Sequence, residues 1–270
     1  MSGLINRIKM IRLIAVLGFV FSGVFSSVSI AETVMITGAN AGIGFEFATQ
    51  YAAKGWGVIA IHRRDTPPVS LLELQAEYPK VSIEYMDITL LDTVRALGAK
   101  LVGQPIDVLL NNAGYAGNFS GPSQALGTLD YDAFDTIMRT NGVGALAVSE
   151  AFIDNVKSSD RKVIVAMSSN LASFGAGPPT GGGYFYRMSK AALHMVLITL
   201  SKDLKEDGVI VAAINPGVVW SQKNLDHGHL AEDQMVKVDI AVGGLINTID
   251  NMTMEDSGWL VNYKAERGVW

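Results

Sequence analysis

The 270-residue chain contains no cysteine and only four histidines. Without cysteine it can form no disulfide, no thiolate nucleophile and no metal site with cysteine ligands, although this does not identify a cellular compartment. His227 and His229 are the only close histidine pair in the sequence. We therefore predict no metal site.

Positive charge is also scarce. The chain carries 21 Lys and Arg against 26 Asp and Glu, which gives a formal net charge of −5. No segment gathers the cluster of basic residues that a nucleic-acid footprint requires. Nucleic acid is therefore not an expected partner.

Apolar residues, by contrast, are abundant, at 49% of the chain. A chain of this length and composition can build one large core, and no internal repeat or low-complexity tract interrupts it. We predict a single domain over residues 32–270.

The N-terminal segment, residues 1–31, has a different pattern. Arg7, Lys9 and Arg12 precede an uncharged run over residues 13–31, and Ser29-Ile30-Ala31 suits a cleavage site with small residues. This is typical of a signal peptide, and a retained run of that length could also anchor the chain in a membrane. We predict an exported or membrane-anchored protein. The alternative is a misassigned start and a cytoplasmic protein, in which the membrane is no partner.

A glycine-rich segment lies where a strand should turn into a helix. Thr33–Thr37 is a short β-branched and apolar run, and apolar residues at helical spacing follow from Ile43. Gly38-Ala39-Asn40-Ala41-Gly42-Ile43-Gly44 joins the two. Such a turn offers unpaired N–H groups and the positive end of a helix dipole to a pyrophosphate. Taken alone, the spacing could also belong to a glycine-rich loop before an ordinary helix, because it matches neither G-x-G-x-x-G nor a P-loop.

Three further apolar runs predict buried strands, at residues 106–110, 162–167 and 208–214. Each run ends at a polar or glycine-containing segment: Asn111 to Gly114, Ser168-Ser169, and Asn215-Pro216-Gly217. In an open parallel sheet, ligands bind outside the carboxyl ends of the strands. We therefore expect these segments and the glycine turn to meet in one crevice.

With these motifs in order, and with Tyr186 four residues before Lys190, the chain resembles the short-chain dehydrogenase/reductase family from about Thr33 to Trp270. Ser168 to Ser173 and Tyr186 to Leu193 resemble the C-factor-like carbonyl reductase branch. The resemblance implies an α/β fold, a single doubly wound Rossmann-type parallel sheet with helices on both faces. It also implies an oxidoreductase that interconverts a carbonyl and an alcohol, and a homo-oligomer.

Tyr186 and Lys190, at i and i+4, lie on one face of a helix if the segment is helical. An ammonium beside a phenol lowers the phenol's pKa, so Tyr186 becomes a plausible general acid or base. The resemblance implies that Lys190 also binds the nicotinamide ribose, that Ser169 holds the substrate oxygen, and that Asn141 is the fourth catalytic residue.

Competing residues accompany these assignments. Ser168 could replace Ser169, and we choose Ser169 because the family places its serine second in such a pair. Tyr184 competes with Tyr186, but Met188, four residues after it, cannot polarise a phenol. Asn141 precedes Gly142, and an Asn-Gly pair is otherwise a turn signal.

Cofactor choice depends on the residues that follow the second predicted strand, Val58–His62. An acidic residue there would bind the adenosine ribose hydroxyls, whereas this chain has His62 followed by Arg63 and Arg64. Guanidinium groups bind phosphate in bidentate geometry, so we predict NADP(H), with NAD(H) as a possible second cofactor. A solvated basic pair is the alternative. Asp87 follows a further predicted strand, Val81–Met86, and the resemblance implies that it recognises the adenine. We expect the cofactor to contact Gly38, Asn40, Ala41, Gly42, Ile43, Gly44, Arg63, Asp87, Asn112, Ala113, Gly114, Tyr186, Lys190, Pro216, Gly217, Val219 and Ser221.

The leading hypothesis is an NADP(H)-dependent carbonyl reductase or alcohol dehydrogenase acting on a small carbonyl or alcohol. A catalytically idle NADP-binding sensor or signalling protein on the same fold is the alternative. Four residues are candidates for an apolar substrate pocket, or for core packing: Phe174, Tyr184, Trp220 and Met235.

Overall fold

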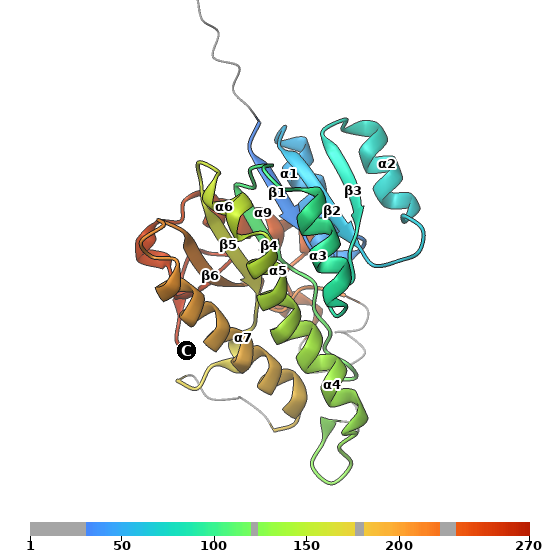
Figure 1. Cartoon of the computed structure of the whole chain (residues 1–270). Coiled ribbons are helices and arrows are strands. Elements are labelled where there is room, and N and C mark those ends of the chain that lie inside the picture. Colours follow the sequence, from blue (N-terminus) through green and yellow to red (C-terminus); the bar gives the residue numbers. More distant parts are fainter. Residues whose placement is uncertain (1–30, 120–123, 176–180, 222–230) are drawn as a thin grey trace, which may run out of the picture. The chain divides into compact units, whose positions relative to one another are not determined.

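An eight-stranded sheet carries the fold, in the order β3-β2-β1-β4-β5-β6-β7-β8 (Figure 1). The computed structural model describes residues 31–119, 124–175, 181–221 and 231–270. The strands β1 to β7 run parallel, and β8 pairs antiparallel with β7. The sheet confirms the predicted fold class, except that its last strand is antiparallel.

The six predicted strands are all present within one or two residues of their expected bounds. Their ranges are β1 Thr33–Ile36, β2 Gly57–His62, β3 Val81–Tyr85, β4 Val108–Asn111, β5 Val163–Met167 and β6 Ile210–Asn215. The two strands that the sequence did not predict are β7 Leu260–Asn262 and β8 Arg267–Gly268.

Helices cover both faces of the sheet. On one face lie α1 (Gly42–Ala53), α2 (Val69–Glu77) and α9 (Val238–Asp250), and on the other lie α3 (Leu91–Lys100), α5 (Ala145–Ala151), α6 (Ile153–Lys157) and α7 (Tyr184–Asp203), with α4 (Asp132–Met138) packed on α7 (Figure 1). Short helical turns are η2 Arg139–Gly144, η3 Asn170–Ala172, η4 Glu232–Gln234 and η5 Met254–Asp256.

The central strands read as continuous apolar runs because both of their faces are covered. In β5, Val163 and Val165 pack toward α1 and α9, while Ile164 and Ala166 pack toward α5 and α7. All residues of β4, β5 and β6 are buried. A strand with two buried faces gains nothing from polar alternation, which explains the sequence pattern.

The strand order reverses at β1. From β1 the chain continues to β2 and β3 on one side, and then crosses to β4 on the other. The two chain directions leave a crevice at the carboxyl ends of β1 and β4, which is where doubly wound sheets bind ligands. The glycine turn after β1 and the Asn112 loop after β4 therefore meet there.

The predicted signal peptide or membrane anchor lies outside the described residues, apart from Ala31, and stays a prediction. Within the ranges that the structure describes, no helix is long and apolar enough to cross a membrane.

Two adjacent glycines in α9 provide a test of the packing between α9 and the segment after β7. A Cβ on Gly244 would lie 2.3 Å from the backbone oxygen of Tyr263, whereas a Cβ on Gly243 would meet only the side chain of Gln50, at 3.4 Å. We expect Gly243→Ala to stabilise the protein by about 0.5–1 kcal/mol, because alanine favours the helix. Gly244→Ala should destabilise it by about 1–3 kcal/mol or more. Urea denaturation of both variants measures this, and equal effects would contradict the packing.

Candidate active site and cofactor cavity

The glycine turn and the loop after β4 are joined by direct hydrogen bonds. The side-chain amide of Asn112 donates to the carbonyl oxygens of Thr37, at 3.0 Å, and Gly38, at 3.3 Å. The N–H of Ala113 donates to Oγ1 of Thr37 at 3.0 Å. These bonds show that the two segments lie together, as expected from the sequence.

Gly44 lies where these two segments come closest. A Cβ at this position would lie 2.3 Å from the oxygen of Gly38 and 2.4 Å from Nδ2 of Asn112. Real Cβ atoms do not approach other atoms so closely, so only glycine fits without moving the turn or breaking the Asn112 bond.

Helix α1 begins within this turn, with Ala41 as its N-cap. Ala41 makes no capping bond through its side chain, and the first turn of the helix holds no acidic residue. The first N–H groups of a helix have no partner within the helix, and they lie at its positive end. The turn is therefore suited to a phosphate group.

A cavity of about 390 Å³ extends from this turn. It brings together most of the predicted cofactor residues, namely Gly38, Asn40, Ala41, Ile43, Gly44, Arg63, Asp87, Asn112, Ala113 and Gly114. Further lining residues that the sequence analysis did not select for the cofactor are His62, Arg64, Met86, Ile88, Thr89, Tyr115 and Thr140. Seven residues that were expected to contact the cofactor do not line this cavity, namely Gly42, Tyr186, Lys190, Pro216, Gly217, Val219 and Ser221.

The basic end of the cavity depends on Arg63 and Arg64. The ring of His62 is buried, which lowers its pKa and keeps it neutral, and its Nδ1 accepts the N–H of Arg64 at 3.3 Å. The Arg63 side chain is 66% exposed and lies 3.9 Å from the carboxylate of Asp87. Asp87 also accepts two bonds from Thr89, at 2.9 and 2.7 Å. Positive charge at this end therefore comes from the arginines.

Tyr186 and Lys190 lie on one face of α7, as the spacing predicts, and the Lys190 ammonium is 5.9 Å from the centre of the Tyr186 ring. Lys190 is only 5% exposed and donates to the carbonyl oxygen of Met167 at 2.8 Å. Burial lowers the Lys190 pKa to about 8, because the charged form loses its hydration.

The expectation that Lys190 lowers the Tyr186 pKa is wrong for this structure. Burial raises the pKa of Tyr186, and a hydrogen bond with the Ser169 side chain offsets only part of that effect. The ammonium of Lys190 is directed at the Met167 carbonyl, so it does not outweigh the loss of hydration of the phenolate. The phenol is therefore protonated at neutral pH.

The structure separates the two candidate serines. Ser169 bonds to Tyr186 and accepts the N–H of Leu171 at 3.2 Å. Ser168 is buried and lies 2.6 Å from Nε2 of His194, a residue that is 3% exposed on α7. Ser169, and not Ser168, is thus the serine beside the phenol.

Asn141 lies in the π-helical turn η2, and π-turns within helices are frequent at functional sites. Its side chain holds the backbone of Tyr115 from both sides, accepting its N–H at 2.7 Å and donating to its oxygen at 2.8 Å. It also donates to Oγ of Ser189 at 2.8 Å. Asn141 therefore ties the cofactor loop to α7.

Gly114 connects the cofactor cavity to these side chains. It lines the cavity, and a Cβ on it would lie 3.4 Å from Oδ1 of Asn141 and 3.6 Å from Nζ of Lys190. The cavity thus ends beside the predicted catalytic residues.

Of the four pocket candidates, Phe174, Tyr184 and Trp220 are exposed, with Phe174 at 83%, and Met235 is partly buried. The three aromatic side chains are therefore not core residues. Val219, which was expected to contact the cofactor, pairs with Val236 in an isolated β-bridge. The segment after β6 therefore runs beside Val236.

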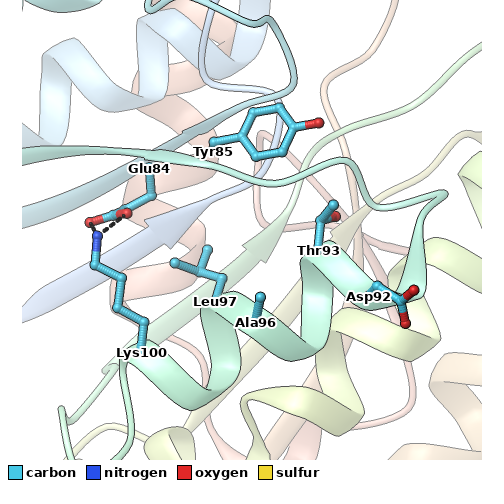
Figure 2. A pocket seen from close by; sticks show the side chains of 7 residues that line it. All are labelled: Glu84, Tyr85, Asp92, Thr93, Ala96, Leu97 and Lys100. Atoms are coloured by element: carbon cyan, nitrogen blue, oxygen red, sulfur yellow. Dashed lines mark hydrogen bonds and ion pairs between the residues drawn. The ribbon is translucent and has the colours of Figure 1, made fainter.

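A second cavity, of about 400 Å³, lies between β3 and α3 and contains none of the predicted site residues. Figure 2 shows Lys100 of α3 reaching to the carboxylate of Glu84, which it contacts at 2.8 and 2.6 Å. Leu97 and Ala96 lie along the same helix. In the described parts of the chain, no group of three His, Asp or Glu residues could hold a metal ion.

Sequence reasoning missed two buried polar residues near the site, His194 and Gln124. His194 follows Lys190 by four residues, so the helical spacing could have placed it on the same face. Gln124 bonds to Gly183 and Tyr186, which lie far along the chain, and no local pattern could have found these contacts.

Comparisons with known proteins agree with this geometry. The family model described as short chain dehydrogenase matches residues 32–228, and the chain belongs to this family. The 1-hydroxy-2-glutathionyl-2-methyl-3-butene dehydrogenase of Rhodococcus sp. (strain AD45) is 32% identical over 84% of this chain and 94% of its own length. The C-signal protein of Myxococcus xanthus is 30% identical over 66% of this chain and all of its own length.

The structure of an NADPH-bound carbonyl reductase from chicken fatty liver is similar as well. It superposes with a TM-score of 0.79 at 27% identity, covering 89% of this chain and 99% of the other. The predicted family is therefore confirmed, and the chain is an oxidoreductase of the short-chain dehydrogenase family.

The burial of Lys190 leads to a prediction for how the free energy of unfolding depends on pH. The pKa of Lys190 is about 8 when folded and 10.5 when unfolded, so the unfolded chain binds more protons between these values and stability rises with pH there. Lys190→Met should raise the unfolding free energy at pH 7 by up to about 3 kcal/mol. This gain should shrink as the pH rises from 8 to 10.5. Denaturation from pH 7 to 10.5 tests this, with the exposed Lys202→Met on the same helix as control. A gain that does not depend on pH would contradict the buried charge.

Proposed function

We propose that this oxidoreductase uses NADP(H) to interconvert a small carbonyl compound and its alcohol, with Tyr186 as the proton-transfer residue. The observation that carries the proposal is the hydrogen bond between the Ser169 and Tyr186 side chains, together with the position of Lys190 beside Gly114, where the cofactor cavity ends. Membership of the family supports the small-molecule substrate and a homo-oligomeric state.

The residues present fit a dinucleotide phosphate. Gly44, at the end of the glycine turn, lies so close to Gly38 and Asn112 that no side chain would fit, and the N-terminus of α1, which has no side-chain cap, lies at the same cavity. Arg63 and Arg64 line its other end, where they would bind a 2′-phosphate. The carbonyl reductase structure with bound NADPH supports the same cofactor. When bound, NADPH supplies the hydride.

Ser169, Tyr186 and Lys190 have separate roles in the rest of the reaction. Ser169 and Tyr186 would both donate hydrogen bonds to the substrate oxygen, which orients the carbonyl and stabilises the charge that develops on that oxygen. Tyr186 then transfers its Oη proton to the oxygen. Because burial raises the pKa of Tyr186, the phenol is in the form that can donate, which favours reduction over alcohol oxidation. Lys190 holds positive charge beside the phenol as the proton leaves.

The sensor or signalling alternative is favoured by one observation, the similarity to a protein named C-signal. An idle binding protein has no need for a proton-donating phenol bonded to a serine hydroxyl, whereas Tyr186 bonds to Ser169 here. The Ser169, Tyr186 and Lys190 arrangement therefore supports an enzyme.

Tyr186→Phe tests the proton-transfer role. Only the hydroxyl is removed, so the fold and cofactor affinity should persist while kcat for aldehyde and ketone reduction falls about 10²–10⁴-fold. NADPH oxidation at the nicotinamide absorbance band measures the loss. Tyr131→Phe, which removes the hydroxyl of an exposed tyrosine on the same protein, is the control. Near-parental turnover in Tyr186→Phe would refute the assignment.

Arg63→Ala tests the cofactor. Loss of a charge-assisted bond to the 2′-phosphate should weaken NADPH by about 10–150-fold and change NADH little. Arg95→Ala is a matched control, because Arg95 is also exposed and also pairs with an aspartate, Asp92, but lies outside the cofactor cavity. Dissociation constants at fixed ionic strength measure both cofactors. A parent that binds NADH as tightly as NADPH, or a variant that weakens both alike, would show that the arginines are only a solvated strand end.

A further inference from the structure

The position of Tyr186 within α7 poses a structural problem. Tyr186 is the third residue of the helix, and the first N–H groups of a helix have no partner within it. A polar side chain at the N-cap usually supplies one. Here the N-cap is Gly183, in the left-handed region at φ +63°, and it has no side chain to offer. The turn that carries the phenol therefore needs a partner from elsewhere.

Gln124, which lies 62 residues before Tyr186 in the chain, supplies that partner. Its Oε1 accepts the N–H of Tyr186 at 3.0 Å, and its backbone oxygen accepts the N–H of Gly183, also at 3.0 Å. Gln124 is 1% exposed, so water does not compete for these bonds. One residue thus fixes both the N-cap and the third position of α7.

The amide of Gln124 has only one workable orientation. Its Nε2 donates to the carbonyl oxygen of Ala116 at 2.7 Å. If the amide were reversed, Nε2 would face the Tyr186 N–H and Oε1 would face the Ala116 oxygen, so both bonds would be lost. The side chain therefore links the loop after β4 to α7 through one donor and one acceptor.

The ring of Phe119 completes this arrangement. It meets the Tyr186 ring edge to face, with 5.2 Å between centroids. It also occupies the space that a side chain on Gly183 would need, since a Cβ there would lie 2.2 Å from the Phe119 ring. The absence of a side chain at the N-cap thus lets Phe119 pack on the phenol, while Gln124 takes over the capping.

We propose that Gln124 is a positioning residue for Tyr186, which caps α7 from the loop after β4 and holds the phenol in register with Ser169. This inference rests on the proposed function, because it assigns Gln124 to the proton transfer by Tyr186. Misplacing a reacting group by about 1 Å can cost on the order of 10²-fold in rate. Loss of the cap should therefore lower kcat and leave cofactor affinity unchanged, since Gln124 does not line the cofactor cavity.

Two variants separate positioning from general stability. Gln124→Met keeps the approximate shape and removes both bonds, and should lower kcat about 10–100-fold. Gln124→Glu can make both bonds only when its carboxyl is protonated, because an ionised carboxylate would face the Ala116 oxygen without a proton between them. Its kcat relative to the parent at the same pH should therefore rise as the pH falls from 8 to 5. The kcat of Gln124→Met relative to the parent should not change with pH. Arg187, the charged group packed on Phe119, is present in both variants, so it cannot cause a difference between them.

Hydrogen exchange gives a readout that does not depend on turnover. Peptides spanning residues 181–190 should exchange faster in Gln124→Met than in the parent. Gln75→Met is the matched control, because Gln75 also donates to a backbone oxygen, that of Val81, but on α2. It should change neither exchange in this segment nor kcat.

The outcomes distinguish this inference from the proposed function. If the parent reduces no carbonyl compound, the proposed function fails and exchange alone tests the cap. If the parent is active, parental kcat in Gln124→Met overturns the positioning role. A relative kcat of Gln124→Glu that is independent of pH, unchanged exchange, or an equal loss of NADPH affinity would each overturn it as well.

Discussion

The close approach of Gly44 to Gly38 and Asn112 is the constraint on which the rest of the site depends. Because no side chain stands at Gly44, the Asn112 amide can bond to the carbonyl oxygens of Thr37 and Gly38 and join the ends of β1 and β4. That junction fixes the cofactor cavity on one side and leads to Gly114, beside Lys190, on the other. A sheet that reverses its strand order provides the crevice, and this contact sets its dimensions.

The chemistry of the site depends on the burial of its ionisable side chains, Tyr186 and Lys190. Lys190 and Tyr186 both have pKa values displaced toward their neutral forms, because their charged forms are poorly hydrated where they lie. Such displacements mark functional sites, since a purely structural interior would replace the lysine with an apolar residue. The surrounding bonds are correspondingly numerous: Lys190 to Met167, Ser169 to Tyr186, and Asn141 to Tyr115 and Ser189. These hold polar groups in position that would otherwise disturb the core.

Much of this could be predicted from the sequence, and the failures have physical causes. Strands buried on both faces appear in the sequence as apolar runs, and β1, β2, β4, β5 and β6 were predicted in this way. The edge strand β3 is only partly buried, and β7 and β8, which were not predicted, span only three and two residues. The i, i+4 spacing placed Tyr186 and Lys190 correctly. It could not reveal that burial outweighs the lysine in setting the phenol's pKa, because burial is a property of the whole fold. Gln124 escaped notice because its bonds to Gly183 and Tyr186 join distant segments.

The central claim is that the cavity and the Ser169, Tyr186 and Lys190 cluster act together to move hydride to a carbonyl carbon. Its most direct test is transfer of deuterium from NADPH labelled at C4 of the nicotinamide to a panel of aldehydes and ketones, with the alcohol products analysed by mass spectrometry. The account predicts one deuterium on the former carbonyl carbon of at least one product. Tight NADPH binding with no deuterium in any product would contradict it and favour an idle binding protein.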